Sequence, residues 1–73
     1  MNIKVKFFNH EWDNYQGAQG KVIIMTRAYN LPDNTKIGDI KNEVIKLILS
    51  EGFHDDWSKN NYTGRGIINI SIL

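Results

Sequence analysis

The apolar residues of this chain change their spacing twice, and this change constrains the fold more than any other feature of the sequence. Residues 2–8 alternate apolar and polar side chains, and so do residues 66–73 at the other end. Between them, residues 37–48 place apolar side chains three and four positions apart. A period of two indicates a half-buried strand, and a period near 3.6 indicates an amphipathic helix. The pattern predicts an α+β domain with one helix between strands.

The first part of the chain predicts a β-hairpin. Ile3, Val5 and Phe7 share one face of the first strand. The polar residues 9–20, which include two glycines, indicate a long loop, and residues 21–28 predict a second strand. Because that second strand is apolar on both faces, we expect it to lie at the centre of the sheet. Strands joined in this way pair antiparallel.

A single amphipathic helix follows the hairpin. Pro32 ends the second strand, and Asn34 or Thr35 can cap the first turn of the helix. Gly52 stands where a glycine commonly terminates a helix. The apolar stripe expected to pack on the sheet consists of Ile37, Ile40, Val44, Ile45, Leu47 and Ile48.

The last third of the chain predicts a second long loop and a closing strand. The loop spans residues 53–65, and residues 55–59 within it are expected to form a short helical turn or an edge strand. In the closing strand, Ile68, Ile70 and Ile72 share one face. The whole chain, residues 1–73, is then a single domain with the order β-hairpin, amphipathic helix, C-terminal strand (ββαβ) and a single three- to four-stranded sheet.

Two stretches resemble the β-grasp (ubiquitin-like) fold. One is Pro32–Val44, in which a proline turn and a threonine precede apolar residues spaced three and four apart, and the other is the opening strand at residues 1–7. The resemblance covers residues 1–52. The chain ends in Ile-Ser-Ile-Leu and not in the Gly-Gly tail of the conjugating and sulfur-carrying members, so the resemblance implies a non-catalytic interaction domain. The alternative is a plain three-stranded antiparallel sheet with one helix on a face.

Composition narrows the class of protein. There is no cysteine, which excludes disulfides and thiolate metal sites, and the net charge of +1 gives no strong attraction to nucleic acid. The longest mostly apolar stretch, residues 44–49, is too short to cross a bilayer. We expect a soluble cytoplasmic protein with no membrane partner. The 11 isoleucines, 9 asparagines and 7 lysines suggest an AT-rich genome such as that of a phage.

No group of residues predicts catalysis. His10, Glu11 and Asp13 lie close together in the sequence, and a second polar group consists of His54, Asp55 and Asp56. Neither group has the pair of histidines four residues apart that binds zinc on a helix, and no serine lies in a nucleophile motif. We therefore predict no enzyme activity, no metal site and no cofactor.

Aromatic residues in the two loops suggest a protein-binding site, because tryptophan and tyrosine provide large contact areas at low entropic cost. The hairpin connection and the end of the helix should lie at the same end of the molecule. The predicted protein-binding residues are Trp12, Tyr15, Phe53, His54 and Trp57. The alternative for Trp12 and Trp57 is that they fold back and cover the small core instead of contacting a partner.

A second predicted surface is a candidate binding site for nucleic acid. Lysines and arginines that gather on one sheet face with Phe8 and Tyr29 would form a basic platform with interleaved aromatic residues. The candidates are Lys4, Lys6, Arg27 and Arg65. The net charge near zero favours an ordinary solvated face instead.

The function we expect is that of a small non-catalytic protein-binding domain, such as a phage- or mobile-element-encoded inhibitor of a host enzyme or defence system. One alternative is a ubiquitin-like accessory subunit of a bacterial assembly, and another is a nucleic-acid-binding regulator. A homodimer is an alternative to a monomer, because the closing strand leaves an exposed edge and the core is thin.

Overall fold

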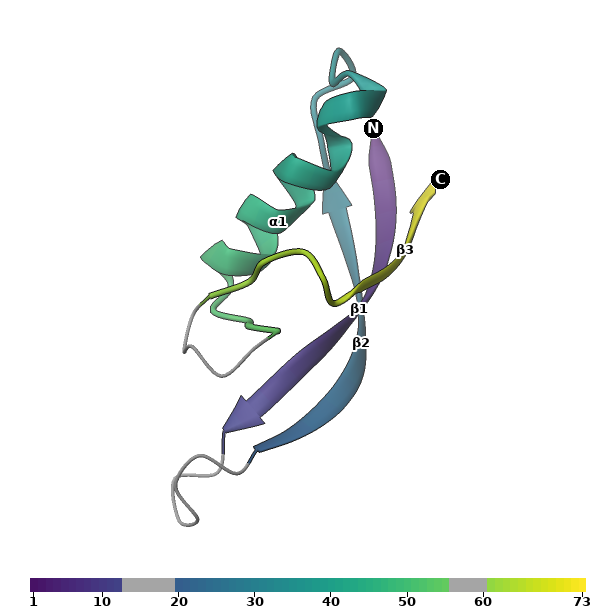
Figure 1. Cartoon of the computed structure of the whole chain (residues 1–73). Coiled ribbons are helices and arrows are strands. Elements are labelled where there is room, and N and C mark those ends of the chain that lie inside the picture. Colours follow the sequence, from purple (N-terminus) through teal and green to yellow (C-terminus); the bar gives the residue numbers. More distant parts are fainter. Residues whose placement is uncertain (13–19, 56–60) are drawn as a thin grey trace.

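The structure is a computed structural model, which describes residues 1–12, 20–55 and 61–73. Its described part is a three-stranded antiparallel sheet with one helix packed on one face, an α+β architecture (Figure 1). The elements in chain order are β1 (Asn2–Trp12), β2 (Gly20–Asn30), the 3₁₀ turn η1 (Ile37–Asp39), α1 (Ile40–Ser50) and β3 (Ile67–Ile72).

The strand order is β2-β1-β3, so β1 is the central strand, and it is antiparallel to both neighbours. The prediction that the second strand is central was wrong. Val22 and Ile24 suggested burial of both faces of β2, but both side chains are more than half exposed. The helix returns the chain alongside β1, and β3 starts opposite Phe7, near the middle of β1, and runs antiparallel to it (Figure 1).

The hairpin is longer than the sequence predicted. Its register runs without a shift from Asn2 opposite Asn30 to Trp12 opposite Gly20, so residues 9–12 belong to β1 and not to a loop. Asn9 is buried, and its side-chain oxygen accepts a hydrogen bond from the His54 backbone N–H at 3.1 Å. A polar residue can continue a buried strand face when its hydrogen bond is satisfied in this way.

The core lies between α1 and the inner face of β1. Every second residue of β1 from Ile3 to Phe7 is fully buried against the helix. Phe7 also contacts two rings, Phe53 at 5.4 Å and Tyr62 at 5.7 Å between centroids. Among the described residues, the buried apolar cluster consists of Ile3, Val5, Phe7, Leu31, Ile40, Val44, Ile48 and Tyr62.

The helix confirms the predicted stripe except at its first member. Ile40, Val44 and Ile48 are buried, but Ile37 is 86 % exposed because it belongs to η1, before the helix proper begins. The predicted threonine or asparagine cap is wrong, since the Thr35 hydroxyl donates to the Pro32 carbonyl at 2.7 Å and α1 has no side-chain cap. Gly52 ends the helix as predicted, with φ of 86° in the left-handed region.

A β-bulge changes the faces of the closing strand. Asn69 pairs with Lys6, but Phe7 pairs with Ile67, so Ile68 is an extra residue in β3. As a result, Ile67 and Ile70 pack against the core while Ile68 is exposed. The prediction that Ile68, Ile70 and Ile72 share one face was therefore wrong for Ile68, whereas Ile70 and Ile72 lie opposite Val5 and Ile3 on the same face.

Candidate binding surface on the open face of the sheet

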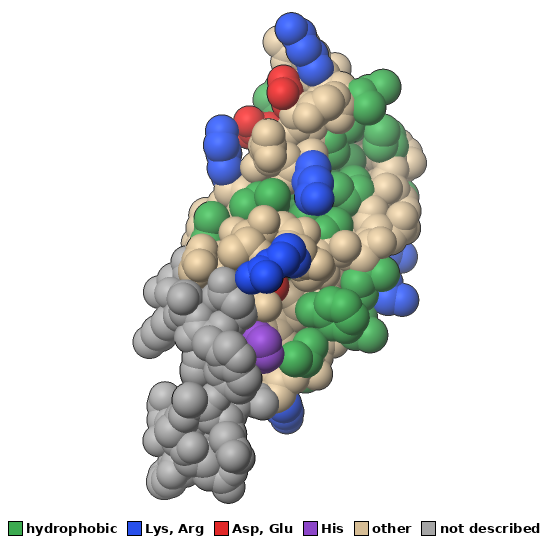
Figure 2. Space-filling view, viewed as in Figure 1, with side chains coloured by type: hydrophobic (Ala, Val, Ile, Leu, Met, Phe, Trp, Pro, Cys, Tyr) green, Lys and Arg blue, Asp and Glu red, His purple; other side chains and the backbone are tan. Residues whose placement is uncertain are grey.

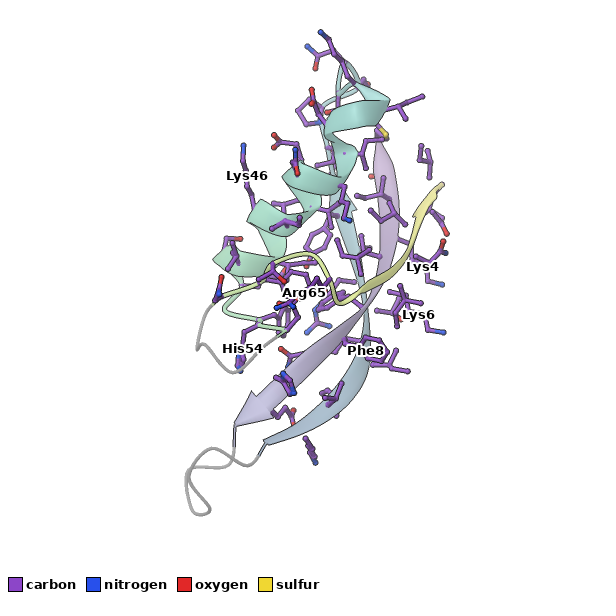
Figure 3. All side chains as sticks on the ribbon, viewed as in Figure 1. Lys4, Lys6, Phe8, Lys46, His54 and Arg65 are labelled. Carbon is purple, nitrogen blue, oxygen red and sulfur yellow. The ribbon has the colours of Figure 1, made fainter. Side chains whose placement is uncertain are left out.

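The face of the sheet opposite α1 is covered by no other described element. Alternation along β1 points Lys4, Lys6 and Phe8 to this face, because the residues between them are buried against the helix. Figure 3 shows these three side chains on the side of the sheet away from α1, whereas Lys46 and His54 lie on the helix side. We call this surface the open face.

Pairing in the sheet brings polar side chains from both edge strands next to the two lysines. Lys4 lies between Ala28 and Ser71, and Lys6 lies between Thr26 and Asn69. The Asn69 side-chain amide donates to the Ser71 hydroxyl at 2.9 Å. A shallow hollow of about 300 Å³ is lined by Lys4, Lys6, Thr26, Asn69 and Ser71. Two ammonium groups at a hollow with amide and hydroxyl groups can bind carboxylate or phosphate oxygens.

The other half of the open face is apolar. Phe8 is opposite Ile24 in the β1–β2 register, and the next residue on this face of β2 is Val22. Their exposed fractions are 40 %, 58 % and 52 %. Figure 2 shows hydrophobic side chains gathered on the sheet side beside basic ones. A contiguous apolar patch of this kind commonly marks a contact surface.

No carboxylate lies among the described side chains of the open face. The strand residues that point there are basic, apolar or uncharged polar. Glu11 belongs to the other face of β1, where it approaches Lys21 at 3.6 Å, and Glu43 pairs with Lys46 on the helix. In Figure 2, acidic and basic side chains occur together on the helix. The chain is nearly neutral as a whole, but its charges are segregated so that the open face is cationic.

The predicted aromatic site is only partly within the described structure. Phe53 and His54 do lie beside the second half of β1, as the topology argument expected, since the His10 backbone N–H donates to the His54 carbonyl at 2.8 Å. However, Phe53 is half-buried against Phe7, and His54 is only 8 % exposed. Trp12 ends β1, and Tyr15 and Trp57 lie outside the described residues.

The four basic candidates are divided between the two sides of the sheet. Lys4 and Lys6 share the open face, but Arg27 is on the helix side of β2, opposite Val5. There its guanidinium lies 3.5 Å from the Glu51 carboxylate and 5.3 Å from the centre of the Phe53 ring. Arg65 also lies on the helix side, in the loop before β3 (Figure 3). The structure therefore brings together two of the four residues.

Tyr29, the second aromatic residue expected on the platform, is also on the helix side, opposite Ile3. Burial raises the pKa of Tyr29, and the nearby Glu51 carboxylate raises it further. Tyr29 is thus a partly buried core residue, and Phe8 is the aromatic residue that the described open face retains.

Asp55 fixes the loop that precedes β3. Its carboxylate accepts hydrogen bonds from the Thr63 backbone N–H and the Gly66 backbone N–H, each at 2.9 Å, and from the Thr63 hydroxyl. Burial alone would raise the pKa of Asp55, but these hydrogen bonds outweigh it and hold the pKa below its usual value. The Asp55 carboxylate therefore holds the loop before β3 in place through Thr63 and Gly66.

Gly66 shows how closely this loop approaches β1. Its carbonyl accepts from the Phe8 backbone N–H at 2.8 Å, so the loop continues the pairing of β1 beyond β3. A side chain at this position would meet the Tyr62 hydroxyl at 2.8 Å and the Phe8 carbonyl at 3.1 Å. The sequence Gly64-Arg65-Gly66 is thus a packed turn into β3.

The described residues contain no group of three or more histidine, cysteine or acidic side chains that could hold a metal ion. Among the described helices, none is long and apolar enough to cross a membrane. No family model, curated protein or solved structure matches the chain.

Proposed function

We propose that this chain is a non-catalytic protein-binding domain and that the open face is its binding surface. The observation that carries the proposal is a hollow at Lys4 and Lys6, whose described lining has no carboxylate, next to an exposed apolar patch of Phe8, Val22 and Ile24. A partner that fits has carboxylates to face the lysines and apolar side chains to cover the patch.

The aliphatic residues favour a protein over a nucleic acid. Val22 and Ile24 occupy the area beside Phe8 where a second stacking ring would be needed. Arg27 and Tyr29, which would have completed a basic aromatic platform, face the helix instead. Burying aliphatic side chains against apolar groups of a protein partner is favourable, because it removes apolar area from water. A polyanion offers little apolar surface for such contact.

The domain acts, in this proposal, by occluding the surface to which it binds. An inhibitor of a host enzyme or defence system, encoded by a phage or mobile element, is the form suggested by the small size and composition of the chain. An accessory subunit of a bacterial assembly would use the same surface. Relationship to the β-grasp fold is a further proposal, supported by the order hairpin, helix and closing strand.

Single-stranded nucleic acid is the second candidate, favoured by one observation. Lys4, Lys6 and Phe8 follow one another on the same face of one strand, and none of the described residues places a carboxylate beside them. Phosphates at the lysines and a base on the phenyl ring would match that arrangement.

Affinity capture with surface variants tests the proposal. Four proteins are immobilised: the wild-type chain, two open-face variants and a control. The open-face variants are Lys4→Glu/Lys6→Glu and Phe8→Ala. The matched control is Lys36→Glu/Lys41→Glu, whose two lysines lie outside the sheet. We expect the same stoichiometric protein to be retained by the wild type and the control, and to be lost from both open-face variants. A protein retained equally by all four would contradict the proposal.

A parallel titration with a fluorescent single-stranded oligonucleotide distinguishes the second candidate. Binding that weakens steeply with salt and is lost in Lys4→Glu/Lys6→Glu would favour nucleic acid. The protein proposal predicts no measurable binding in this assay at physiological salt.

A further inference from the structure

The outer edge of β2 is a long strand edge with no partner among the described residues. β2 has eleven residues, pairs with β1 alone and contains neither proline nor a register shift. The opposite edge is more protected, because β3 has six residues and a bulge, and the backbone of residues 54 and 66 pairs with the remainder of β1. An open edge of this length is a template for strand addition.

We propose that a second copy of this chain adds to the sheet through β2, so that the two β2 strands pair antiparallel about a two-fold axis at Met25. This inference goes beyond the proposed function and does not depend on it. The occupant is a second copy because β2 is complementary to itself in this register, as the following pairs show.

Met25 is the midpoint of β2, so an axis there pairs all eleven residues from Gly20 to Asn30 without overhang. The paired residues also share a face, as antiparallel pairing requires. On the open face, Ile24 is opposite Thr26 of the second copy, and Val22 is opposite Ala28. These are β-branched and small residues, which suit cross-strand contact.

The charges select the same register. With Met25 on the axis, Lys21 is opposite Tyr29 of the second copy, and Arg27 is opposite Ile23. A shift that moves the axis to Ile24 would place Lys21 opposite Arg27 twice, and like charges directly opposite each other destabilise a sheet. Moving the axis to Thr26 would leave Gly20 and Lys21 without strand partners.

The product is a six-stranded antiparallel sheet of order β3-β1-β2-β2-β1-β3. The two-fold axis is perpendicular to the sheet, because directly opposed residues of an antiparallel pair point to the same side. Both helices then lie on one side, and the two open faces form one continuous surface on the other. The exposed patches around Ile24 become neighbours across the axis, which reduces the apolar area left to water.

Solution mass gives the first test. Light scattering after size exclusion, repeated over a dilution series, should show twice the 8.5 kDa chain mass at high concentration and a decline towards the chain mass on dilution. A mass of one chain at every concentration would overturn the proposal.

Cross-linking tests the position of the axis. The chain has no cysteine, so Met25→Cys introduces a single thiol at the point where the two copies meet. Directly opposed residues in antiparallel strands have Cα atoms about 4.5–5.5 Å apart, within the range of a disulfide. Under mild oxidation we expect covalent dimer from Met25→Cys and much less from the control Ser71→Cys on β3. Equal yields from both variants would overturn the assigned edge.

Placing opposite charges on the two copies tests the register, and unlike the Met25→Cys test it changes only exposed residues. One chain carries Ile24→Lys/Thr26→Lys and the other Ile24→Glu/Thr26→Glu, at two exposed positions that face each other across the axis. Each alone should be monomeric through repulsion, and an equimolar mixture should regain the dimer mass. A mixture that stays monomeric, or either variant dimerising alone as the wild type does, would overturn the register. Because these readouts are masses, they fail or succeed independently of partner capture by the open face.

Discussion

The two faces of β1 differ completely although their residues alternate along one strand. On the helix side, Ile3, Val5 and Phe7 are fully buried, whereas Lys6 and Phe8 on the open face are exposed. Successive residues of a strand are only about 3.3 Å apart along its axis, but their side chains point to opposite faces of the sheet. Neighbouring positions can therefore have unrelated roles. The comparison indicates that stability depends on one face of this strand, and our proposal assigns recognition to the other.

Truncation of two adjacent phenylalanines tests this difference most strongly. Phe7→Ala removes a fully buried ring that contacts Phe53 and Tyr62, and should lower the free energy of unfolding by about 3–5 kcal/mol. Phe8→Ala, at an exposed ring, should lower it by less than about 1 kcal/mol. Urea denaturation of both variants measures the two values. Similar losses would show that the two faces do not differ in the way described.

Asp55→Ala should have the next largest effect on stability. The change leaves the backbone N–H groups of Thr63 and Gly66 without their acceptor, at a cost of about 1–3 kcal/mol in the free energy of unfolding. Asp39→Ala is the control, because that exposed carboxylate makes no side-chain capping bond. A loss from Asp39→Ala as large as that from Asp55→Ala would refute the role given to the loop.

Asp55 also predicts how stability depends on pH. Its pKa is lower in the folded chain than the unfolded value of about 3.9, so its contribution is complete above that value and is lost as pH falls through the folded pKa. Unfolding curves between neutral pH and the acid range should show stability falling at the acid end. In Asp55→Asn this part of the decline should be absent, and an unchanged acid decline would argue against the assignment.

The smallest effect on stability is expected from Lys4→Glu/Lys6→Glu. Both ammonium groups are exposed and have no ion-pair partner within 4 Å among the described residues, so the free energy of unfolding should change by less than about 0.5 kcal/mol. Thermal unfolding followed by circular dichroism checks this. A large loss would mean that the hollow contributes to the fold and would weaken its interpretation as a binding surface.

Several elements of the fold were predictable because their signals are local. The alternation of Ile3, Val5 and Phe7 identified the inner face of β1, and the spacing of Ile40, Val44 and Ile48 identified the buried side of the helix. Other features were not local. The exposed Ile37 belongs to the same sequence period as the stripe, but the 3₁₀ turn removes it from the core.

The candidate surface could be predicted only in part. Lys4, Lys6 and Phe8 were recognised as neighbours on one strand face, and the structure keeps them together. Arg27 was grouped with them because the alternation within β2 does not say how β2 is aligned with β1. The register places Arg27 opposite Val5, on the side where Glu51 and Phe53 hold it.

The sequence by itself determined the type of each main element and the buried apolar side chains in the first half of β1 and on α1, because periodicity is a property of neighbouring residues. Only the tertiary structure decided that β1 is central, that β3 carries a bulge, and that a nearly neutral chain presents a face on which no described side chain is a carboxylate. Strand order and register are set by contacts between segments far apart in the chain. Composition and local spacing therefore cannot specify them.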